Sequence, residues 1–145
     1  MWVKLDQLPS SSPGRTMLYT AWYGFSCEVT SSGSTYFRTY LTNGQKDSPS
    51  GTLTINNWIH WVGVKSSTGV SLYLNGTLIG TSLTTDNFNW KSVSSNSVAS
   101  YNNNYYLYGK LSDLKLYATA LSAEDIKELH NTSAIVDNLG NDYCY

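Results

Sequence analysis

The dipeptide Asn75-Gly76, set between two apolar runs, constrains the fold of this chain more than any other feature. Leu-Tyr-Leu precedes it at 72–74, and Leu-Ile follows it at 78–79. Asn-Gly suits a type I′ turn, which needs positive φ at both central positions and joins two antiparallel strands. The sequence therefore predicts a hairpin over residues 70–83.

Residues 58–65, Trp-Ile-His-Trp-Val-Gly-Val-Lys, indicate a strand with apolar side chains on both faces. Such a strand is typical of the centre of a sheet that is covered on both sides. Further strands are predicted at 2–5, 16–23, 25–30, 35–41, 98–99 and 111–117. Regularly spaced short strands, separated by Ser-, Asn-, Pro- and Gly-rich turns, indicate an antiparallel sandwich or jelly roll.

One segment departs from the strand pattern and predicts a short helix from residue 122 onward. Ser122 is placed to be the N-cap, with Asp125 three residues later in an approximate capping box. Leu121 and Ile126 are spaced as a hydrophobic staple, and Ile126 and Leu129 would hold one face against the sandwich.

Composition narrows the function classes. The length of 145 residues suits a single domain, and the net charge of −1 with no basic run argues against a nucleic-acid surface. No apolar stretch approaches the ~20 residues of a membrane span. The first residues lack the apolar h-region of a signal peptide.

There is no C-x-x-C motif, and we expect Cys27 to be a buried free thiol.

Five segments resemble laminin G-like domains of the concanavalin A-like lectin/glucanase superfamily. W-I-H-W-V-G-V followed by L-Y-L-N-G-T-L-I-G resembles the W-x-H-x-A-V strand and the L-Y-x-N/D-G hairpin of that family. G-K-L-S-D-L-K-L-Y and A-L-S-A-E-D-I are similar to its last strand and closing helical turn, and W-V-K-L resembles an early strand. The resemblance implies an all-β, two-sheet antiparallel jelly-roll sandwich over residues 1–130 with one short C-terminal helix. Residues 131–145 are then a tail or the start of a following segment.

The N-terminus departs from the family pattern. Family members usually carry a further strand before the W-V-K segment, whereas Met1 directly precedes Trp2 here. Either the chain is a fragment, or another element supplies the strand, since an unfilled strand position is an edge open to pairing. We hypothesise that residues 134–136 or a neighbouring subunit fills it.

Catalytic chemistry is not expected. Glycoside hydrolysis needs two carboxyl groups at a fixed separation, and the related glucanases carry them in E-x-D-x-E-type patterns. The chain has three glutamates, of which Glu124 and Glu128 belong to the predicted helix and Glu28 has no acidic partner two or four residues on. We expect His60 to be a structural residue of its strand, and His130 to sit favourably at the helix C-terminus.

A calcium site is a further expectation. Calcium prefers six to eight oxygen ligands, usually with more than one carboxylate. Asp86 and Asn87 are the best candidates, although Asn-rich loops are more often plain turns. The cofactor prediction is therefore none, with Ca²⁺ as the alternative.

Two aromatic and amide-rich loops have the composition of a carbohydrate site. A sugar site needs an exposed aromatic platform ringed by hydrogen-bonding groups. The candidate residues are Asn89, Trp90, Tyr101, Asn103 and Tyr105. The alternative is that these aromatic side chains close the ends of the core.

Together these features predict a non-catalytic, lectin-like binding module of a larger surface or virion protein that contacts glycans. The alternatives are a purely structural part of a particle, or an accessory module beside a glycoside hydrolase. Residues 131–145 also resemble segments of bacteriophage structural and fibre proteins. We expect an extracellular or virion-surface location, with other subunits of an assembly as further partners, and neither nucleic-acid binding nor membrane insertion.

Overall fold

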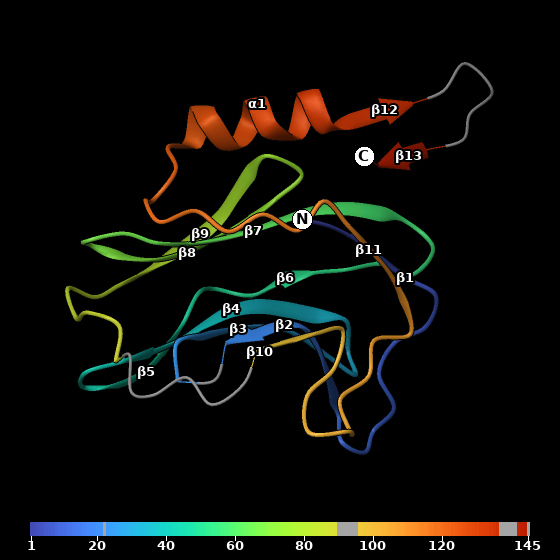
Figure 1. Cartoon of the computed structure of the whole chain (residues 1–145), viewed down its shortest axis with the longest axis horizontal. Helices are drawn as coiled ribbons and strands as arrows, with labels where there is room; N and C mark the ends of the chain where they lie inside the picture. Colours follow the sequence, from blue (N-terminus) through green and yellow to red (C-terminus); the bar gives the residue numbers. More distant parts are fainter. Residues whose placement is uncertain (22, 90–95, 137–141, 145) are drawn as a thin grey trace.

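Two antiparallel sheets lie face to face in the computed structural model, which describes residues 1–21, 23–89, 96–136 and 142–144 (Figure 1). The first sheet has five strands, in the spatial order β11 (Gly109–Ser112), β1 (Trp2–Leu5), β7 (Trp58–Lys65), β8 (Gly69–Leu74) and β9 (Thr77–Leu83). The second has six, in the order β10 (Asn96–Val98), β2 (Arg15–Ala21), β3 (Phe25–Thr30), β4 (Ser34–Leu41) and β5 (Gly44–Asp47), with β6 (Gly51–Thr52) also paired to β4. The sandwich fold is confirmed.

The core lies between the two sheets, and the side chain of Trp61 connects them. Its indole packs edge-on against Phe37 of the opposite sheet, with ring centroids 6.0 Å apart. Its Nε1–H also donates a hydrogen bond of 2.8 Å to Thr35 Oγ1. A buried indole N–H needs such a partner, so this bond fixes how the two sheets align.

The predicted hairpin is present as β8 and β9. Asn75 and Gly76 at its turn have φ values of 50° and 74°, as a type I′ turn requires. The Asn75 side chain does more than permit the turn, because its Oδ1 accepts a hydrogen bond of 2.9 Å from the backbone N–H of His60. The turn is thereby tied to the central strand β7.

Helix α1 (Ala123–Ser133) covers the outer side of the five-stranded sheet (Figure 1). The capping box is confirmed: Asp125 N donates to Ser122 Oγ at 3.1 Å, and Ser122 N donates to Asp125 Oδ2 at 3.0 Å. Ile126 is fully buried, and Trp2 Nε1 donates to Ser133 Oγ at 3.0 Å near the helix end. The helix continues to Ser133, so residue 130, the expected domain end, lies inside it. In the part of the chain that the structure describes, no helix has the length and apolar character that crossing a membrane requires.

Some predicted strands differ from the observed ones. Strands 2–5, 25–30 and 58–65 are confirmed to the residue, whereas β5 and β6 were not predicted. β5 reads Gly-Gln-Lys-Asp, and a polar edge strand of this kind carries no apolar alternation to reveal it.

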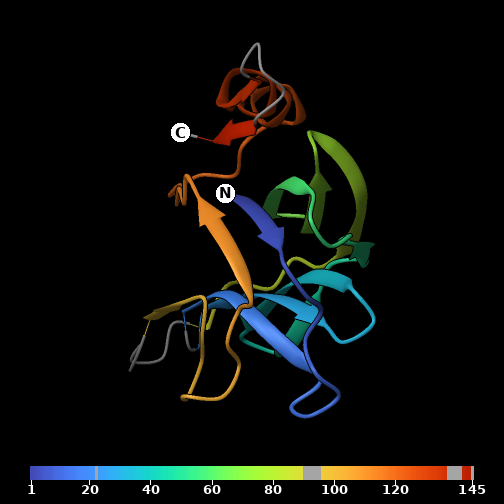
Figure 2. The same ribbon diagram turned by 90° about the vertical axis from the view of Figure 1, so that its right-hand side faces the viewer.

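The strand predicted at 111–117 is wrong beyond Ser112. β11 pairs with β1, and this ladder stops at the Trp2–Ser112 pair. Asp113 then takes a φ of 52°, outside the strand region. Residues 114–117 have the alternation of a strand, yet among the described strands none pairs with them. Figure 2 shows β11 in orange beside β1 in blue, with the chain leaving the sheet beyond them.

The hypothesis that residues 134–136 fill the vacant strand position is also wrong. They form β12 (Ala134–Val136), which pairs with β13 (Asp142–Cys144) in a separate two-stranded sheet. Figure 1 shows this hairpin beyond the end of α1. Pairing with a segment close in sequence closes a short loop, which costs less entropy than reaching back to the sandwich.

Candidate binding face

The outer face of the six-stranded sheet carries a polar cluster centred on Glu28. Cys27, Val29 and Phe37 point into the core, so the alternating residues on β3 and β4 point away from it. On that outward side the Glu28 side chain is nevertheless only 1% exposed. A buried carboxylate needs compensating partners, and the neighbouring strands supply them.

Three side chains donate hydrogen bonds to the Glu28 carboxylate, and Arg38 forms an ion pair with it. Ser26 Oγ donates to Oε1 at 2.7 Å and Tyr36 OH donates to Oε2 at 2.8 Å. Arg15 Nη1 donates to Oε2 at 3.2 Å, and Arg38 Nη1 lies 3.3 Å from Oε1. Strands β2, β3 and β4 are therefore joined through one acidic group.

Arg38 links the cluster to the sheet edge. Its Nε and Nη2 donate to the two carboxylate oxygens of Asp47 on β5 at 2.9 and 2.8 Å, a bidentate pair. Its guanidinium also lies 5.1 Å from the centre of the Tyr36 ring. The bond to Asp47, together with Glu28, raises the pKa of Arg38. Burial, then the Glu28 charge, raises the pKa of Tyr36 to about 12.

The predicted tyrosines lie beside this cluster. The rings of Tyr101 and Tyr105 are tilted by 35° with centroids 5.8 Å apart, and the Arg15 guanidinium is 5.9 Å from the centre of Tyr105. The carbonyl of Tyr105 accepts hydrogen bonds from Thr16 Oγ1 at 3.0 Å and from Met17 N at 3.3 Å, which docks the loop on β2. Asn103, with a φ of 54°, is exposed at the turn of the same loop.

The second predicted loop runs along the end of β4. Asn89 N donates to the Tyr40 carbonyl at 2.9 Å, and Thr42 N donates to the Asn87 carbonyl at 3.0 Å. Burial raises the pKa of Tyr40, with smaller contributions from the charges of Glu28 and Tyr101. Trp90 lies outside the described residues.

Asp86 is engaged in local hydrogen bonds. Its Oδ1 accepts from Asn43 Nδ2 at 2.7 Å and its Oδ2 from Thr84 Oγ1 at 3.2 Å. Among the described residues, no three His, Cys, Asp or Glu side chains gather as a metal site would require. A calcium ion at Asp86 and Asn87 would therefore depend on backbone and amide oxygens beside a single carboxylate. It stays a prediction.

Glu28, Arg15, Tyr36 and Arg38 were not predicted as members of this face. A signal was present, because Glu28 stands alone between two core residues of β3 and the chain has only two arginines. The sequence alone does not reveal that β2, β3 and β4 pair with one another, and this pairing brings Arg15 and Arg38 to the same carboxylate.

The chain belongs to the concanavalin A-like lectin/glucanases superfamily, whose laminin G-type family model matches residues 1–127. No curated protein sequence matches it. Among solved structures, the binding domain of botulinum neurotoxin DC in complex with SialylT has a TM-score of 0.58 and 19% identity, over 99% of this chain and 38% of that one.

Two further solved structures are similar to the same extent. The binding domain of botulinum neurotoxin DC in complex with rat synaptotagmin II has a TM-score of 0.57 and 19% identity, over 97% of this chain and 37% of that one. A structure described as "Cell entry of botulinum neurotoxin type C is dependent upon interaction with two ganglioside molecules" has a TM-score of 0.56 and 17% identity, over 99% and 38%. This chain thus spans less than two fifths of those chains, and the likeness is one of fold.

Proposed function

We propose that this chain is a non-catalytic, glycan-binding module of a larger surface protein. The sugar would lie on the outer face of the six-stranded sheet, against Tyr101 and Tyr105. The observation that carries the proposal is the pairing of these two rings beside the Arg15–Glu28–Arg38 cluster. A tyrosine face accepts the apolar C–H side of a sugar ring, and the flanking groups bind its hydroxyls.

Arg15 supplies the polar side of the proposed site. Its side chain is 39% exposed and it uses one N–H on Glu28, which leaves donors facing solvent beside Tyr105. Guanidinium donors bind hydroxyl and carboxylate oxygens. Neutral and acidic sugars are therefore the ligand class, and the SialylT complex and ganglioside interaction reported for the toxin neighbours support this choice.

The cluster also argues against hydrolysis. A glycosidase needs a carboxyl group that donates a proton to the glycosidic oxygen. Glu28 is covered by two guanidiniums and Tyr36, and Asp47 is held in a bidentate pair with Arg38. Both acids serve to hold the sheet together. Surface attachment, in a larger assembly or a virion, is the role that fits such a module.

A glycan array followed by titration calorimetry tests the proposal. Tyr105→Ala and Tyr101→Ala should each weaken binding about tenfold, the value of one stacking platform. Tyr108→Ala is the matched control, because Tyr108 is exposed on the same connection but precedes β11. Binding to no glycan class would overturn the proposal and favour a structural particle role. A loss confined to Trp90→Ala would move the site to the other loop.

A further inference from the structure

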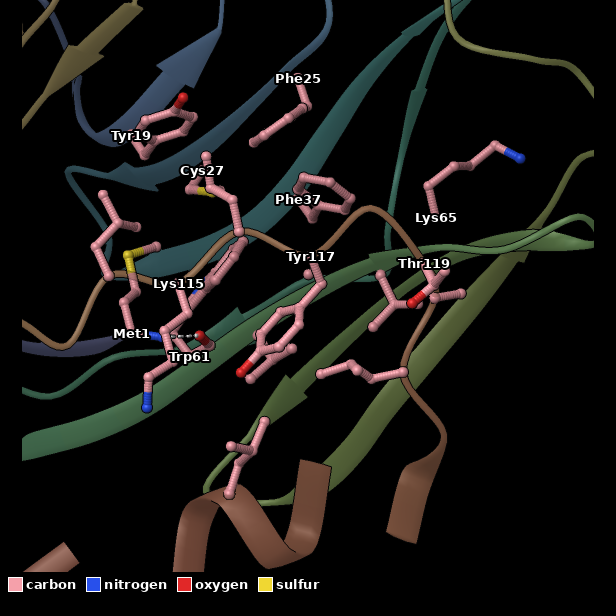
Figure 3. A pocket seen from close by; sticks show the side chains of 18 of the residues that line it. Met1, Tyr19, Phe25, Cys27, Phe37, Trp61, Lys65, Lys115, Tyr117 and Thr119 are labelled. Carbon is pink, nitrogen blue, oxygen red and sulfur yellow. Dashed lines mark hydrogen bonds between the residues drawn. The ribbon is translucent and has the colours of Figure 1, made fainter. Parts of the chain in front are cut away.

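The thiol of Cys27 is poorly placed for spontaneous covalent chemistry. It lies in the wall of an apolar cavity of about 550 Å³, beside Tyr19 and Phe37 (Figure 3). Burial raises the pKa of this thiol, so the reactive thiolate is scarce. The two Asn-Gly dipeptides of the sequence, at 43–44 and 75–76, are the next groups that react without an enzyme.

An Asn-Gly dipeptide converts its own amide to an acid. The backbone nitrogen of the glycine attacks the Cγ of the asparagine, so an N–Cγ bond forms and a cyclic imide closes. The Cγ–Nδ2 bond breaks, and Nδ2 leaves as ammonia with the proton that the backbone nitrogen has lost. Water then adds to either carbonyl of the ring, which gives aspartate or isoaspartate. Glycine favours the attack because it has no Cβ in the way.

Asn75 is held in a geometry that opposes this attack. Its Oδ1 accepts a hydrogen bond of 2.9 Å from the backbone N–H of His60, and its own N–H donates to the His60 carbonyl at 2.8 Å. A Cβ added at Gly76 would lie 3.3 Å from the Cβ of His130 and 3.4 Å from the Cα of Lys127, so α1 confines the turn. Turning the Asn75 amide toward the nitrogen of Gly76 would leave the His60 N–H without its partner.

Asn43 lies in the opposite environment, at the turn between β4 and β5. Residues 42–45 are all exposed. A Cβ added at Gly44 would meet no atom within 4 Å, so none of the described residues packs closely against this glycine. The nitrogen of Gly44 is therefore free to approach the Asn43 side chain without displacing a neighbour.

The Asn43 amide also has a carboxylate beside its leaving nitrogen. Nδ2 donates to Asp86 Oδ1 at 2.7 Å, and Asp86 Oδ2 accepts from Thr84 Oγ1 at 3.2 Å. Nδ2 must gain a proton before it leaves as ammonia, and a nearby negative charge stabilises the positive charge that develops there. Asp86 is thus placed to assist the breaking of the Cγ–Nδ2 bond.

We propose that Asn43 is a self-modifying site, at which Gly44 supplies the nucleophile and Asp86 assists the departure of ammonia. A neutral amide becomes a carboxylate, so the net charge of −1 becomes one unit more negative. Two carboxylates then face each other in place of the hydrogen bond between Asn43 and Asp86, and like charges repel. The reaction needs only water as a co-reactant, and it is independent of the proposed glycan binding.

The modification should loosen the contact between the turn at 42–45 and residues 84–89. Asn89 N donates to the Tyr40 carbonyl at 2.9 Å, and Thr42 N donates to the Asn87 carbonyl at 3.0 Å, both within this contact. Amide hydrogen exchange at Asn89 and Thr42 should become about tenfold faster in the modified chain, because one hydrogen bond fewer opposes local opening.

Peptide mapping by mass spectrometry tests the proposal on the whole chain. In a mildly alkaline buffer at body temperature, aspartate and isoaspartate should accumulate at position 43 about tenfold faster than at position 75. In urea, where the fold is lost, the two dipeptides should react at similar rates, which separates the effect of the fold from that of the sequence. Equal rates in the folded chain, or no reaction at position 43, would overturn the proposal.

Asp86→Asn tests the part played by Asp86. The substitution keeps a hydrogen-bond acceptor beside Asn43 but removes the negative charge. We expect the reaction at Asn43 to slow about threefold, a modest factor because water screens the charge at this exposed turn. Asp6→Asn is the matched control, since it makes the same change at an exposed position next to β1 and should leave the rate unaltered. An unchanged or faster rate in Asp86→Asn would contradict the role given to Asp86, because the hydrogen bond would then only restrain the amide.

Discussion

His60 of β7 and His130 of α1 stack on one another, with ring centroids 5.7 Å apart and planes 21° apart. Trp2 completes the group, 5.0 Å from His60 and 5.4 Å from His130. Among the described atoms, the Nδ1 of each histidine is buried without a hydrogen-bond partner. Two imidazoles packed in this way both resist protonation, so the docking of α1 on the sheet should depend on pH.

The first prediction is acid destabilisation through His60. Burial, and then the neighbouring positive charge of the Met1 amine, lowers the pKa of His60 from 6.5 to about 4. Between pH 6.5 and 4, the imidazole of His60 is therefore protonated in the unfolded chain and neutral in the folded chain. The contribution of His60 to the free energy of unfolding is fully present above pH 6.5. It is lost as the pH drops from 6.5 to 4, by roughly 3 kcal/mol in all. Urea unfolding at pH 7 and at pH 4.5 measures the loss.

His60→Phe is the variant that isolates this effect. Phenylalanine keeps the stack with Trp2 but cannot take up a proton. The difference in unfolding free energy between pH 7 and pH 4.5 should be smaller in His60→Phe than in the unmodified chain, by about 2 kcal/mol. Equal losses in both proteins would show that other groups govern the acid response.

The second prediction concerns the buried carboxylate. Glu28→Gln leaves Arg15 and Arg38 facing a neutral amide, and breaking a buried ion pair is strongly destabilising. Because Arg15 is partly exposed, we expect a loss of about 2 to 3 kcal/mol, measured by chemical denaturation. The pKa of Tyr36, about 12 in the unmodified chain, should fall, because the negative charge of Glu28 contributes to it.

Glu124→Gln is the control for Glu28→Gln. Glu124 is exposed in the first turn of α1, so the same chemical change there should alter stability by less than about 0.5 kcal/mol. A similar loss in the two variants would mean that the Glu28 cluster contributes no more than a surface charge.

The third prediction concerns the cap of α1. Ser122→Ala removes the hydroxyl that accepts from Asp125 N, and should destabilise the helix by about 1 kcal/mol. Amide exchange in α1 should become faster, while exchange in β3 and β4 stays the same. Ser122→Asp should restore the cap, and failure to do so would argue against this hydrogen bond as the cause.

Much of the fold could be predicted because its signals are local. The Asn75-Gly76 turn, the alternation of residues 58–65 and the Ser122–Asp125 box each lie within one short segment, and each is confirmed. The strand expected at 111–117 ends at Ser112, because alternation describes a strand's faces but not its hydrogen-bond partner. Whether such a segment joins a sheet is decided by what lies beside it.

The candidate face was predictable only in part, for a related reason. Tyr101 and Tyr105 were found from loop composition, and the structure places both rings together. Their polar neighbours come from three different strands, and Glu28 meets Arg38 only through the register of β3 and β4. Pairing between strands that are distant in sequence cannot be inferred from the residue at any single position.

The last prediction compares two glycines with positive φ. Gly76→Ala and Gly44→Ala both place a side chain in a conformation that favours glycine, with φ of 74° and 119°. At Gly44 a new Cβ would meet no atom within 4 Å, whereas at Gly76 it would lie 3.3 Å from the Cβ of His130. Both variants should lose about 1 kcal/mol from backbone strain. Gly76→Ala should lose more, because α1 must shift to make room for the new methyl group.

Thermal unfolding of the two glycine variants, combined with tryptophan fluorescence, separates strain from contact. The larger loss in Gly76→Ala should come with a change in the emission of Trp2, whose ring lies 5.4 Å from that of His130. If the variants lose equal stability and the fluorescence is unchanged, the hairpin turn does not support α1. The helix would then be held chiefly by Ile126 and by the bond from Trp2 to Ser133.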